Sequence, residues 1–193
     1  MTDQPDRRRV MQGAALLTAA ATLPATAFAM ETPMTDDPGV HDFDFFFGSW
    51  HVKHHQLQGR LVNSTTWLDF DGTCDARPVM AGAGNMDDNV INKPTGSYRA
   101  ATFRAYDPKT KTWAIWWLDG RTPHNPVDPP MIGSFKDGIG TFLADDSWEG
   151  KKVKVRFLWS HITKTSCRWE QAFSADGGQT WETNWVMENT RTA

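Results

Sequence analysis

Two histidines, His54 and His161, are the side chains that could carry acid–base chemistry in this chain. Each lies in a segment where every second residue is apolar, so each is predicted to face the interior beside indole rings. Burial disfavours a charged imidazole, and a neutral one can accept a proton. Arg104, Tyr98 or Gln171 would then stabilise the negative charge that develops on a substrate. The alternative is that both histidines have a purely structural place in the wall of the fold.

The spacing of the histidines argues against a metal site. His51, His54 and His55 are close in sequence, but neighbours on a strand point to opposite faces, and His51 and His55 would lie about 13 Å apart at about 3.3 Å per residue. A haem would need one inward-facing histidine, for which His161 is the candidate. The sequence also contains neither a nucleophile elbow nor a glycine-rich phosphate loop. We therefore expect no metal and no other cofactor.

The elements that would position these residues are β-strands. Segments rich in Trp, Phe, Val and Thr recur, and each is bounded by Gly, Pro, Asn or Asp. The predicted strands are 48–58, 61–70, 77–86, 97–107, 112–119, 131–136, 139–144, 152–161, 166–174 and 180–189. Short turns between them indicate an antiparallel meander. An open sheet of this size would leave exposed edges, so the sequence predicts an all-β, up-and-down barrel of the calycin or lipocalin-like type, with a two-sheet sandwich as the alternative.

Alternation within these strands predicts which side chains face inward. The predicted inward sets are Trp50, Val52 and His54; Val153, Val155, Phe157, Trp159 and His161; Trp169, Gln171 and Phe173; and Trp181, Thr183, Trp185 and Met187. In 97–107 both faces are mixed, and Tyr98 and Arg104 share one of them.

The inward faces together predict a cavity with an aromatic wall and a few polar groups, which is the character of a small-molecule site. The predicted ligand-binding residues are Trp50, Trp117, Asp119, Phe157, Trp159, Trp169, Gln171 and Trp185. The alternative is a filled barrel in which the indoles pack against one another.

A short motif at the head of the first predicted strand, Gly48-Ser49-Trp50, follows three phenylalanines. It resembles the G-x-W signature of lipocalins and fatty-acid-binding proteins, in which the Trp plugs the closed end of the barrel. In those proteins an Arg from a late strand covers the indole and gains cation–π energy. Arg168 and Arg191 are both candidates for that role here.

A wider resemblance rests on five further stretches: His41-Asp42-Phe43-Asp44-Phe45, Tyr106-Asp107-Pro108, Trp116-Trp117-x-Asp119, Arg156-x-x-Trp159 and 169–185. Together they resemble a family of exported bacterial proteins with a calycin-like barrel, a domain of unknown function. The resemblance covers about 41–191. It implies the fold, and it carries no catalytic residue with it.

The segment Ser174-x-Asp176-x-Gly178-x-Thr180-Trp181 resembles the Asp-box of sialidases and other propellers. In that motif the aspartate binds turn amides and the Trp packs beneath, so it shapes a hairpin. A propeller would repeat it in every blade, whereas this chain has it once. We therefore do not infer a glycosidase.

The proline-rich segment 121–130 is the longest irregular stretch between predicted strands. Loops of this kind often cover a binding site. The alternative is a crossover whose prolines keep the chain out of the sheet.

The first 29 residues have the features of a targeting signal rather than of a folded domain. Arg7-Arg8-Arg9 precede an uncharged run that ends in Ala27-Phe28-Ala29, a small-x-small cleavage site. The run is too short and too rich in Ala and Thr for a membrane span. Paired arginines favour the twin-arginine route over an ordinary secretory signal. We expect a signal peptide over 1–29, a flexible leader over 30–40 and a barrel domain over 41–191, in a periplasmic or secreted protein.

Charge and cysteine content limit the possible partners. Removing the three arginines and two aspartates of 1–29 from 20 basic and 23 acidic residues leaves 17 and 21, a net charge of −4. A mildly acidic chain with no basic run is a poor match for nucleic acid or an anionic membrane. Cys74 and Cys167 could form a disulfide in an oxidising compartment or remain two buried thiols. Nothing in the sequence specifies an oligomeric state.

Two functions therefore remain open. The first is a carrier or sensor that binds a small hydrophobic or aromatic molecule. The second is a cofactor-independent lyase, isomerase or cyclase that uses His54 or His161 as its base.

Overall fold

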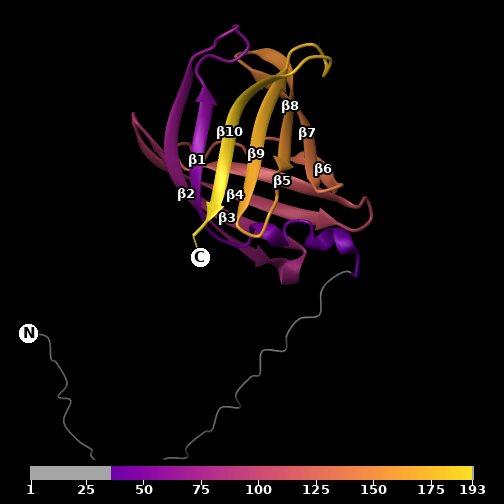
Figure 1. Ribbon diagram of the computed structural model, residues 1–193. Helices are drawn as coiled ribbons and strands as arrows, with labels where there is room; N and C mark the ends of the chain where they lie inside the picture. The colour runs from indigo at the N-terminus through magenta and orange to yellow at the C-terminus, as the bar shows by residue number, and fades with distance from the viewer. Residues whose placement is uncertain (1–35, 193) are drawn as a thin grey trace, which may run out of the picture. The chain divides into compact units, whose positions relative to one another are not determined.

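The computed structural model describes residues 36–192, which form a closed antiparallel barrel of ten strands (Figure 1). The strands are β1 (Gly48–Leu57), β2 (Trp67–Val79), β3 (Gly84–Lys93), β4 (Gly96–Asp107), β5 (Thr112–Asp119), β6 (Met131–Lys136), β7 (Ile139–Trp148), β8 (Lys151–Ser160), β9 (Ser166–Ser174) and β10 (Glu182–Arg191). Each pairs with its neighbour in sequence, and β1 pairs with β10 to close the sheet. The predicted all-β up-and-down barrel is thus confirmed. The predicted signal peptide, 1–29, lies outside the described residues.

Two predicted strands were misplaced. Instead of 61–70, the chain forms a loop that returns at Trp67, because Leu61 and Asn63 take positive φ angles and the Gln58 amide donates to the Thr66 carbonyl. The strand that follows, β2, has 13 residues and runs through Arg77, so β3 begins at Gly84 rather than at 77. The turn between them is the 3-10 helix η3 (Met80–Gly82).

One end of the barrel, called the closed end below, is plugged by two 3-10 helices, η1 (Pro38–His41) and η2 (Asp44–Phe46). They are the indigo coils beneath the strands in Figure 1. The plug's fully buried rings are Phe43 and Trp113, both 0% exposed. Trp113 Nε1 donates to the Gly39 carbonyl, 2.9 Å away, which anchors η1 to β5. Residues 37–40 therefore belong to the folded domain, which we expected to begin at His41.

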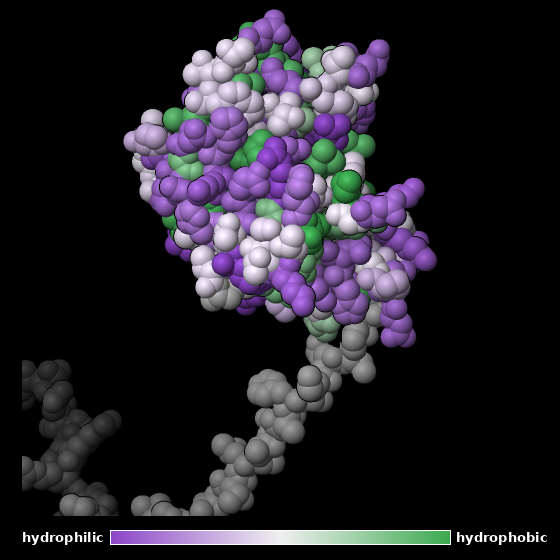
Figure 2. All heavy atoms as spheres, viewed as in Figure 1, coloured by the Kyte–Doolittle hydropathy of each residue, from purple (hydrophilic) through white to green (hydrophobic). Residues whose placement is uncertain are grey.

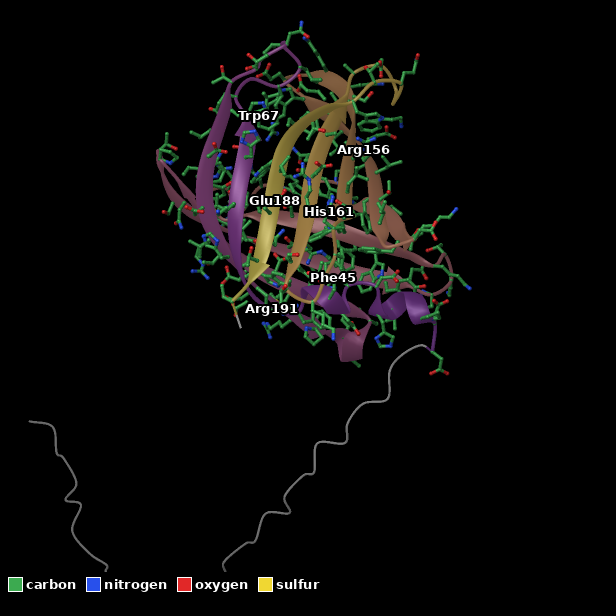
Figure 3. The ribbon with its side chains drawn as sticks, in the orientation of Figure 1. Phe45, Trp67, Arg156, His161, Glu188 and Arg191 are labelled. Carbon is green, nitrogen blue, oxygen red and sulfur yellow. The ribbon has the colours of Figure 1, made fainter. Side chains whose placement is uncertain are left out.

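The G-x-W resemblance is borne out in structural detail at the closed end. Trp50 is 1% exposed and donates to the Phe46 carbonyl at 2.8 Å. The arginine that covers it is Arg191, whose guanidinium lies 4.2 Å from the ring centroid. Arg191 also donates to the carbonyls of Phe45 and Lys164, and Figure 3 shows it beside Phe45 at the foot of β10. Arg168 instead pairs with glutamates on the outer face.

The inward faces follow the predicted alternation in most strands, with two corrections. His161 comes after β8 has ended, has a positive φ and is exposed, so it does not face the interior. A β-bulge between Thr183 and Trp185 turns Asn184 inward, where it is 0% exposed and accepts a hydrogen bond from Gln171 at 2.8 Å. The bulge reverses the predicted alternation N-terminal to it: Trp181 packs under Arg156 instead of entering the barrel.

The charged side chains of the strands lie mostly at outward-facing positions. The face in Figure 2 is mostly hydrophilic or intermediate, with hydrophobic residues in scattered patches. Among residues 36–192, no helix has the length and apolar character needed to cross a membrane. Cys74 and Cys167 are both buried free thiols, so the structure contains no bridge between them. Burial raises the pKa of the Cys167 thiol to about 12, which makes it unreactive.

Candidate functional site

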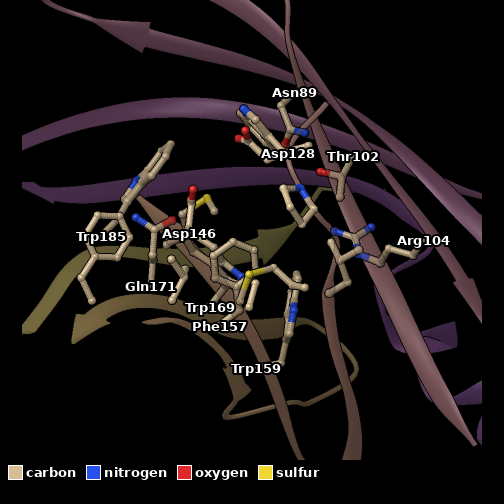
Figure 4. Close-up of a pocket in the computed structure, with 18 of the residues that line it drawn as sticks. Asn89, Thr102, Arg104, Asp128, Asp146, Phe157, Trp159, Trp169, Gln171 and Trp185 are labelled. Carbon is tan, nitrogen blue, oxygen red and sulfur yellow. The ribbon is translucent and has the colours of Figure 1, made fainter. Parts of the chain in front are cut away.

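The barrel encloses a cavity of about 420 Å³ above the aromatic plug (Figure 4). This volume falls in the usual range for small-molecule sites, roughly 300–1,000 Å³. Eight aromatic residues line it: Phe46, Trp117, Trp148, Phe157, Trp159, Trp169, Phe173 and Trp185. The interior is therefore hollow rather than filled by its indoles.

Most of the predicted ligand-binding residues surround this cavity. Trp117, Phe157, Trp159, Trp169, Gln171 and Trp185 line it, and so does Arg104 from the predicted catalytic set. Figure 4 shows Gln171 and Trp185 on one side, and Arg104 on the other. They converge because β4, β5, β8, β9 and β10 turn the same face toward the barrel axis.

Two predicted ligand-binding residues do not line the cavity. Trp50 lies in the closed-end plug, where its ring stacks on Phe46 at 5.4 Å, and Phe46 is the residue that faces the cavity. Asp119 lies at the end of β5 and is held by Arg121, whose side-chain hydrogen bonds lower the pKa of this carboxyl. Both residues already have partners within the protein.

The predicted base His54 lies in the wall but does not line the cavity. It is 4% exposed and stacks on Phe70 with centroids 4.6 Å apart, and its Nδ1 accepts a hydrogen bond from Trp185 at 3.2 Å. Burial lowers the pKa of His54 to about 4, so the ring is neutral at pH 7, as predicted. A Cβ on Gly72 would lie 2.8 Å from the His54 ring, so the bare glycine makes room for it. The lone pair of the neutral ring is thus engaged by an indole.

The other two predicted catalytic residues also lie outside the cavity lining. Tyr98 packs against the small cluster around Phe70 and Ile91, and the Arg121 guanidinium covers its ring at 4.0 Å. Burial raises the pKa of the Tyr98 hydroxyl. His161 is exposed after the end of β8, and its Nδ1 lies 3.0 Å from the Ser160 hydroxyl. The four residues proposed for acid–base chemistry therefore do not converge.

A buried ion pair forms the polar part of the cavity near the closed end. Arg104 Nη1 lies 2.7 Å from Asp87 Oδ2, and the two side chains are 4% and 2% exposed. Asp87 also accepts from the Thr102 amide and from Asn89, so its charge is fully partnered. The Arg104 guanidinium stacks over Phe43, Phe46 and Trp159 at 5.1–5.5 Å from their centroids.

Three residues that line the cavity have buried N–H groups without a protein partner. They are Arg104 through Nε, Trp148 through Nε1 and Trp159 through Nε1. An unmet buried donor costs about 1–3 kcal/mol. Trp50 and Trp113 of the plug, by contrast, donate to backbone carbonyls.

The open end of the cavity, opposite the plug, is formed by loops and strand ends. Arg60, from the loop after β1, stacks over Trp148 and Phe173 at 4.8 and 5.1 Å. The proline-rich segment contributes Asp128 and Pro129, which agrees with a cover for the barrel mouth. Asp146 enters from the end of β7.

Sequence reasoning missed Asp87, Asn89, Arg60, Asp128, Asp146 and Trp148. Asp87 and Asn89 were missed because β3 was placed too early in the chain. Asp146 and Trp148 were missed because β7 was expected to end at Ala144. The alternation of 139–148 continues to Trp148, and this signal could have found them.

Two other predictions concern sites away from the cavity. The Asp-box-like segment is a structural hairpin, because Asp176 accepts from the Thr180 hydroxyl and from the amides of Thr180 and Gln179, which lowers the pKa of its carboxyl. Within 36–192 there is no group of His, Cys, Asp and Glu side chains that could hold a metal ion.

Comparison with known proteins supports the fold assignment. No protein-family model matches the chain. No curated protein matches it in sequence either. Among solved structures it is similar to the S-type phycobiliprotein lyase CPES from Guillardia theta, with a TM-score of 0.51 and 8% sequence identity, over 78% of this chain and 90% of that one. At that identity the likeness concerns the fold alone, and this chain is a lipocalin-like barrel with an indole-lined cavity.

Proposed function

We propose that this protein binds a small hydrophobic or aromatic molecule inside its barrel. The observation that carries the proposal is the cavity of about 420 Å³ with eight aromatic residues in its lining. Burying rings against indoles gains apolar area and favourable ring–ring geometry. Polar side chains in the same lining, among them Gln171 and Asn89, offer polar contacts that would orient the guest.

Binding is better supported than acid–base catalysis by the same geometry. The similar solved structure is a lyase, which keeps catalysis as a second candidate. No histidine within 36–192 lines the cavity, however, and the neutral His54 has its Nδ1 occupied by Trp185. An enzyme built on this site would have to use the Arg104–Asp87 pair, and Asp87 already accepts three hydrogen bonds or ion pairs.

A titration with N-phenyl-1-naphthylamine, a neutral two-ring probe, tests the proposal. Excitation of the cavity indoles should transfer energy to the bound probe, with saturation at one probe per chain. Ala144 lines the cavity, so the larger ring of Ala144→Trp should fill it and abolish the signal. Its matched control is Ala114→Trp, which adds the same ring on the outward face of β5 between the inward Trp113 and Ile115.

The control should bind as the wild type does. If the wild-type protein gives no saturable signal, or if both substitutions leave the titration unchanged, the cavity is not the binding site and the proposal fails.

Export to the periplasm or the exterior is a further part of the proposed function. Its support is the run of arginines before an uncharged segment that ends in Ala27-Phe28-Ala29. Mass spectrometry of the protein from its own cells should find a mature chain that begins near Met30. Recovery of the intact N-terminus from the cytoplasmic fraction would contradict it.

A further inference from the structure

The three amide side chains that line the cavity share one orientation. They are Asn89, Gln171 and Asn189. Each uses its NH2 group as a donor to another group of the protein, and none of the three amide oxygens accepts a hydrogen bond from residues 36–192. The amides therefore present their oxygens, which are acceptors, to a molecule inside the barrel.

The partners of two of these NH2 groups can only accept, which fixes the orientation of the amides. Asn89 Nδ2 donates to the Asp87 carboxylate at 2.5 Å. Asn189 Nδ2 donates to the carbonyls of Cys167 and Met187 at 3.3 and 3.4 Å. Turning either amide over would place an oxygen against another oxygen, because carboxylates and carbonyls have no hydrogen to give. The direction of each free oxygen is thus set by the protein.

Gln171 is held by a residue that only a strand irregularity brings into the barrel. The β-bulge between Thr183 and Trp185 turns Asn184 inward, where it is 0% exposed. Asn184 Oδ1 accepts from Gln171 Nε2 at 2.8 Å, and Asn184 Nδ2 donates to the Glu182 carbonyl. Because this chain of bonds ends on a carbonyl, it fixes both amides. Without the bulge, position 184 would face outward and Gln171 would lose its partner.

The Gln171 oxygen is open to the cavity. The residue as a whole is buried at 9% exposure, but its oxygen is not one of the unpartnered atoms that packing closes off, unlike Nε1 of Trp148 and of Trp159. Figure 4 shows Gln171 reaching into the cavity from one side, with Thr102 and Arg104 on the other. The other two amide oxygens are open in the same sense.

An acceptor in this position selects for guests that carry a donor. Water can bond to such an oxygen in the free protein, but an apolar guest that displaces the water leaves the oxygen unmet. An N–H or O–H group on the guest replaces the lost bond instead. Sites built to hydrogen-bond their ligand therefore discriminate against an analogue that lacks the donor.

We propose that the guest is an aromatic molecule with an N–H or O–H group, as in phenols and N–H heteroaromatics, and that Gln171 Oε1 accepts its hydrogen bond. Asn184 is a positioning residue, because it acts through Gln171. The oxygens of Asn89 and Asn189 extend the same preference to guests with more than one donor. This inference rests on the proposed binding function and adds the chemical class of the guest.

Competition of three naphthalenes against N-phenyl-1-naphthylamine tests the class. They are 2-naphthol, its isostere 2-methylnaphthalene, which lacks the donor, and 2-methoxynaphthalene, which keeps the oxygen without its hydrogen. The wild-type protein should bind 2-naphthol more tightly than 2-methoxynaphthalene. The ratio of the affinities for 2-naphthol and 2-methylnaphthalene is then compared between variants, which isolates the contribution of the hydrogen bond.

Gln171→Met removes the acceptor and keeps the length of the side chain. The affinity ratio should fall by about tenfold, through weaker binding of 2-naphthol. Gln56→Met is the matched control, because Gln56 is also buried in the wall but does not line the cavity, and its oxygen accepts from Lys93 at 2.7 Å. This control should leave the ratio unchanged.

Asn184→Ala tests the positioning role. It frees the Gln171 amide without removing it, so the ratio should fall by a smaller factor, about threefold. Binding of 2-methylnaphthalene should stay unchanged, whereas a merely structural role would weaken both probes alike. An unchanged ratio would remove Asn184 from the account.

Each outcome separates this inference from the binding function itself. A ratio that is equal in the wild type and in Gln171→Met, or that Gln56→Met lowers as much, overturns the inference while binding stands. If Gln171→Met does not fold, the wild-type comparison decides, and 2-naphthol binding no more tightly than 2-methoxynaphthalene overturns the inference. If none of the three naphthalenes displaces bound N-phenyl-1-naphthylamine, the inference fails alone. If N-phenyl-1-naphthylamine itself does not bind, both fail.

Discussion

The two halves of the barrel use the same residue type in opposite ways. At the closed end, Trp50 and Trp113 are at most 1% exposed, and each indole N–H donates to a backbone carbonyl. In the cavity half, Trp148 and Trp159 present ring surface to the cavity, and their indole N–H groups are buried without a protein partner. A tryptophan packed inside the plug serves stability, whereas one whose ring lines the cavity is available for contact with a guest.

Removal of a plug indole should give the largest loss of stability. Trp113→Ala leaves a void in the closed-end plug, and we expect a loss of about 3–5 kcal/mol in the free energy of unfolding. Denaturant titration measures it. Trp116→Ala, on the outward face of the same strand, should cost clearly less, and equal losses would show that Trp113 is not a central part of the plug.

Breaking the buried ion pair should have the next largest effect. Arg104→Met leaves Asp87 buried without its counter-ion, and we expect a loss of about 3 kcal/mol in the free energy of unfolding. Adding Asp87→Asn should recover most of that loss, because a neutral amide oxygen still accepts from Thr102 and Asn89. A double variant no more stable than the single one would mean that the Arg104 ring contacts, rather than the charge, provide the stability.

Acid should weaken the cavity wall through His54. Because burial lowers its pKa from 6.5 to about 4, the unfolded chain binds a proton there before the folded one does. Stability due to this group is therefore retained above about pH 6.5 and declines as the pH falls toward 4, by about 2–3 kcal/mol. Unfolding curves at pH 7 and pH 4 for the wild type and His54→Phe measure it. The variant should lose less on acidification, and an equal loss would contradict the assignment.

Loss of the arginine that covers Trp50 should have the smallest effect of the four. Arg191→Met removes a cation–π contact at 4.2 Å and hydrogen bonds to backbone carbonyls, but the side chain is only partly buried. We expect a loss of about 1–2 kcal/mol in the free energy of unfolding. Arg168→Met, on the outer face, is the control and should cost less. A larger loss for Arg168→Met would overturn the assignment of the signature arginine.

The fold followed from local pattern, because strict alternation in β8 and β9 and short turns between strands leave little choice but a meander. The closed end was also predictable from Gly48-Ser49-Trp50, although choosing Arg191 over Arg168 required the register of β10 against β1. These features depend on side-chain periodicity and on turn chemistry, both of which are local.

The site was less predictable, because its polar members depend on irregularities. One bulge at Asn184 changed the face of Trp181, and a turn at His161 took that residue out of the barrel. The Arg104–Asp87 pair joins neighbouring strands, and Asp87 lay outside the predicted strand 77–86. An error in placing a strand moves a polar residue to the other face of the sheet. The aromatic lining could still be predicted, because many tryptophans are spread over the strands.

Indole NMR tests the contrast between plug and cavity most directly. With ¹⁵N-labelled protein, each tryptophan gives one Nε1–H resonance, and N-phenyl-1-naphthylamine can be titrated against all of them at once. The account predicts that the resonances of Trp148, Trp159, Trp169 and Trp185 shift while those of Trp50 and Trp113 stay fixed. Shifts confined to Trp50, Trp113 and the outward Trp116, with the cavity resonances unmoved, would contradict it.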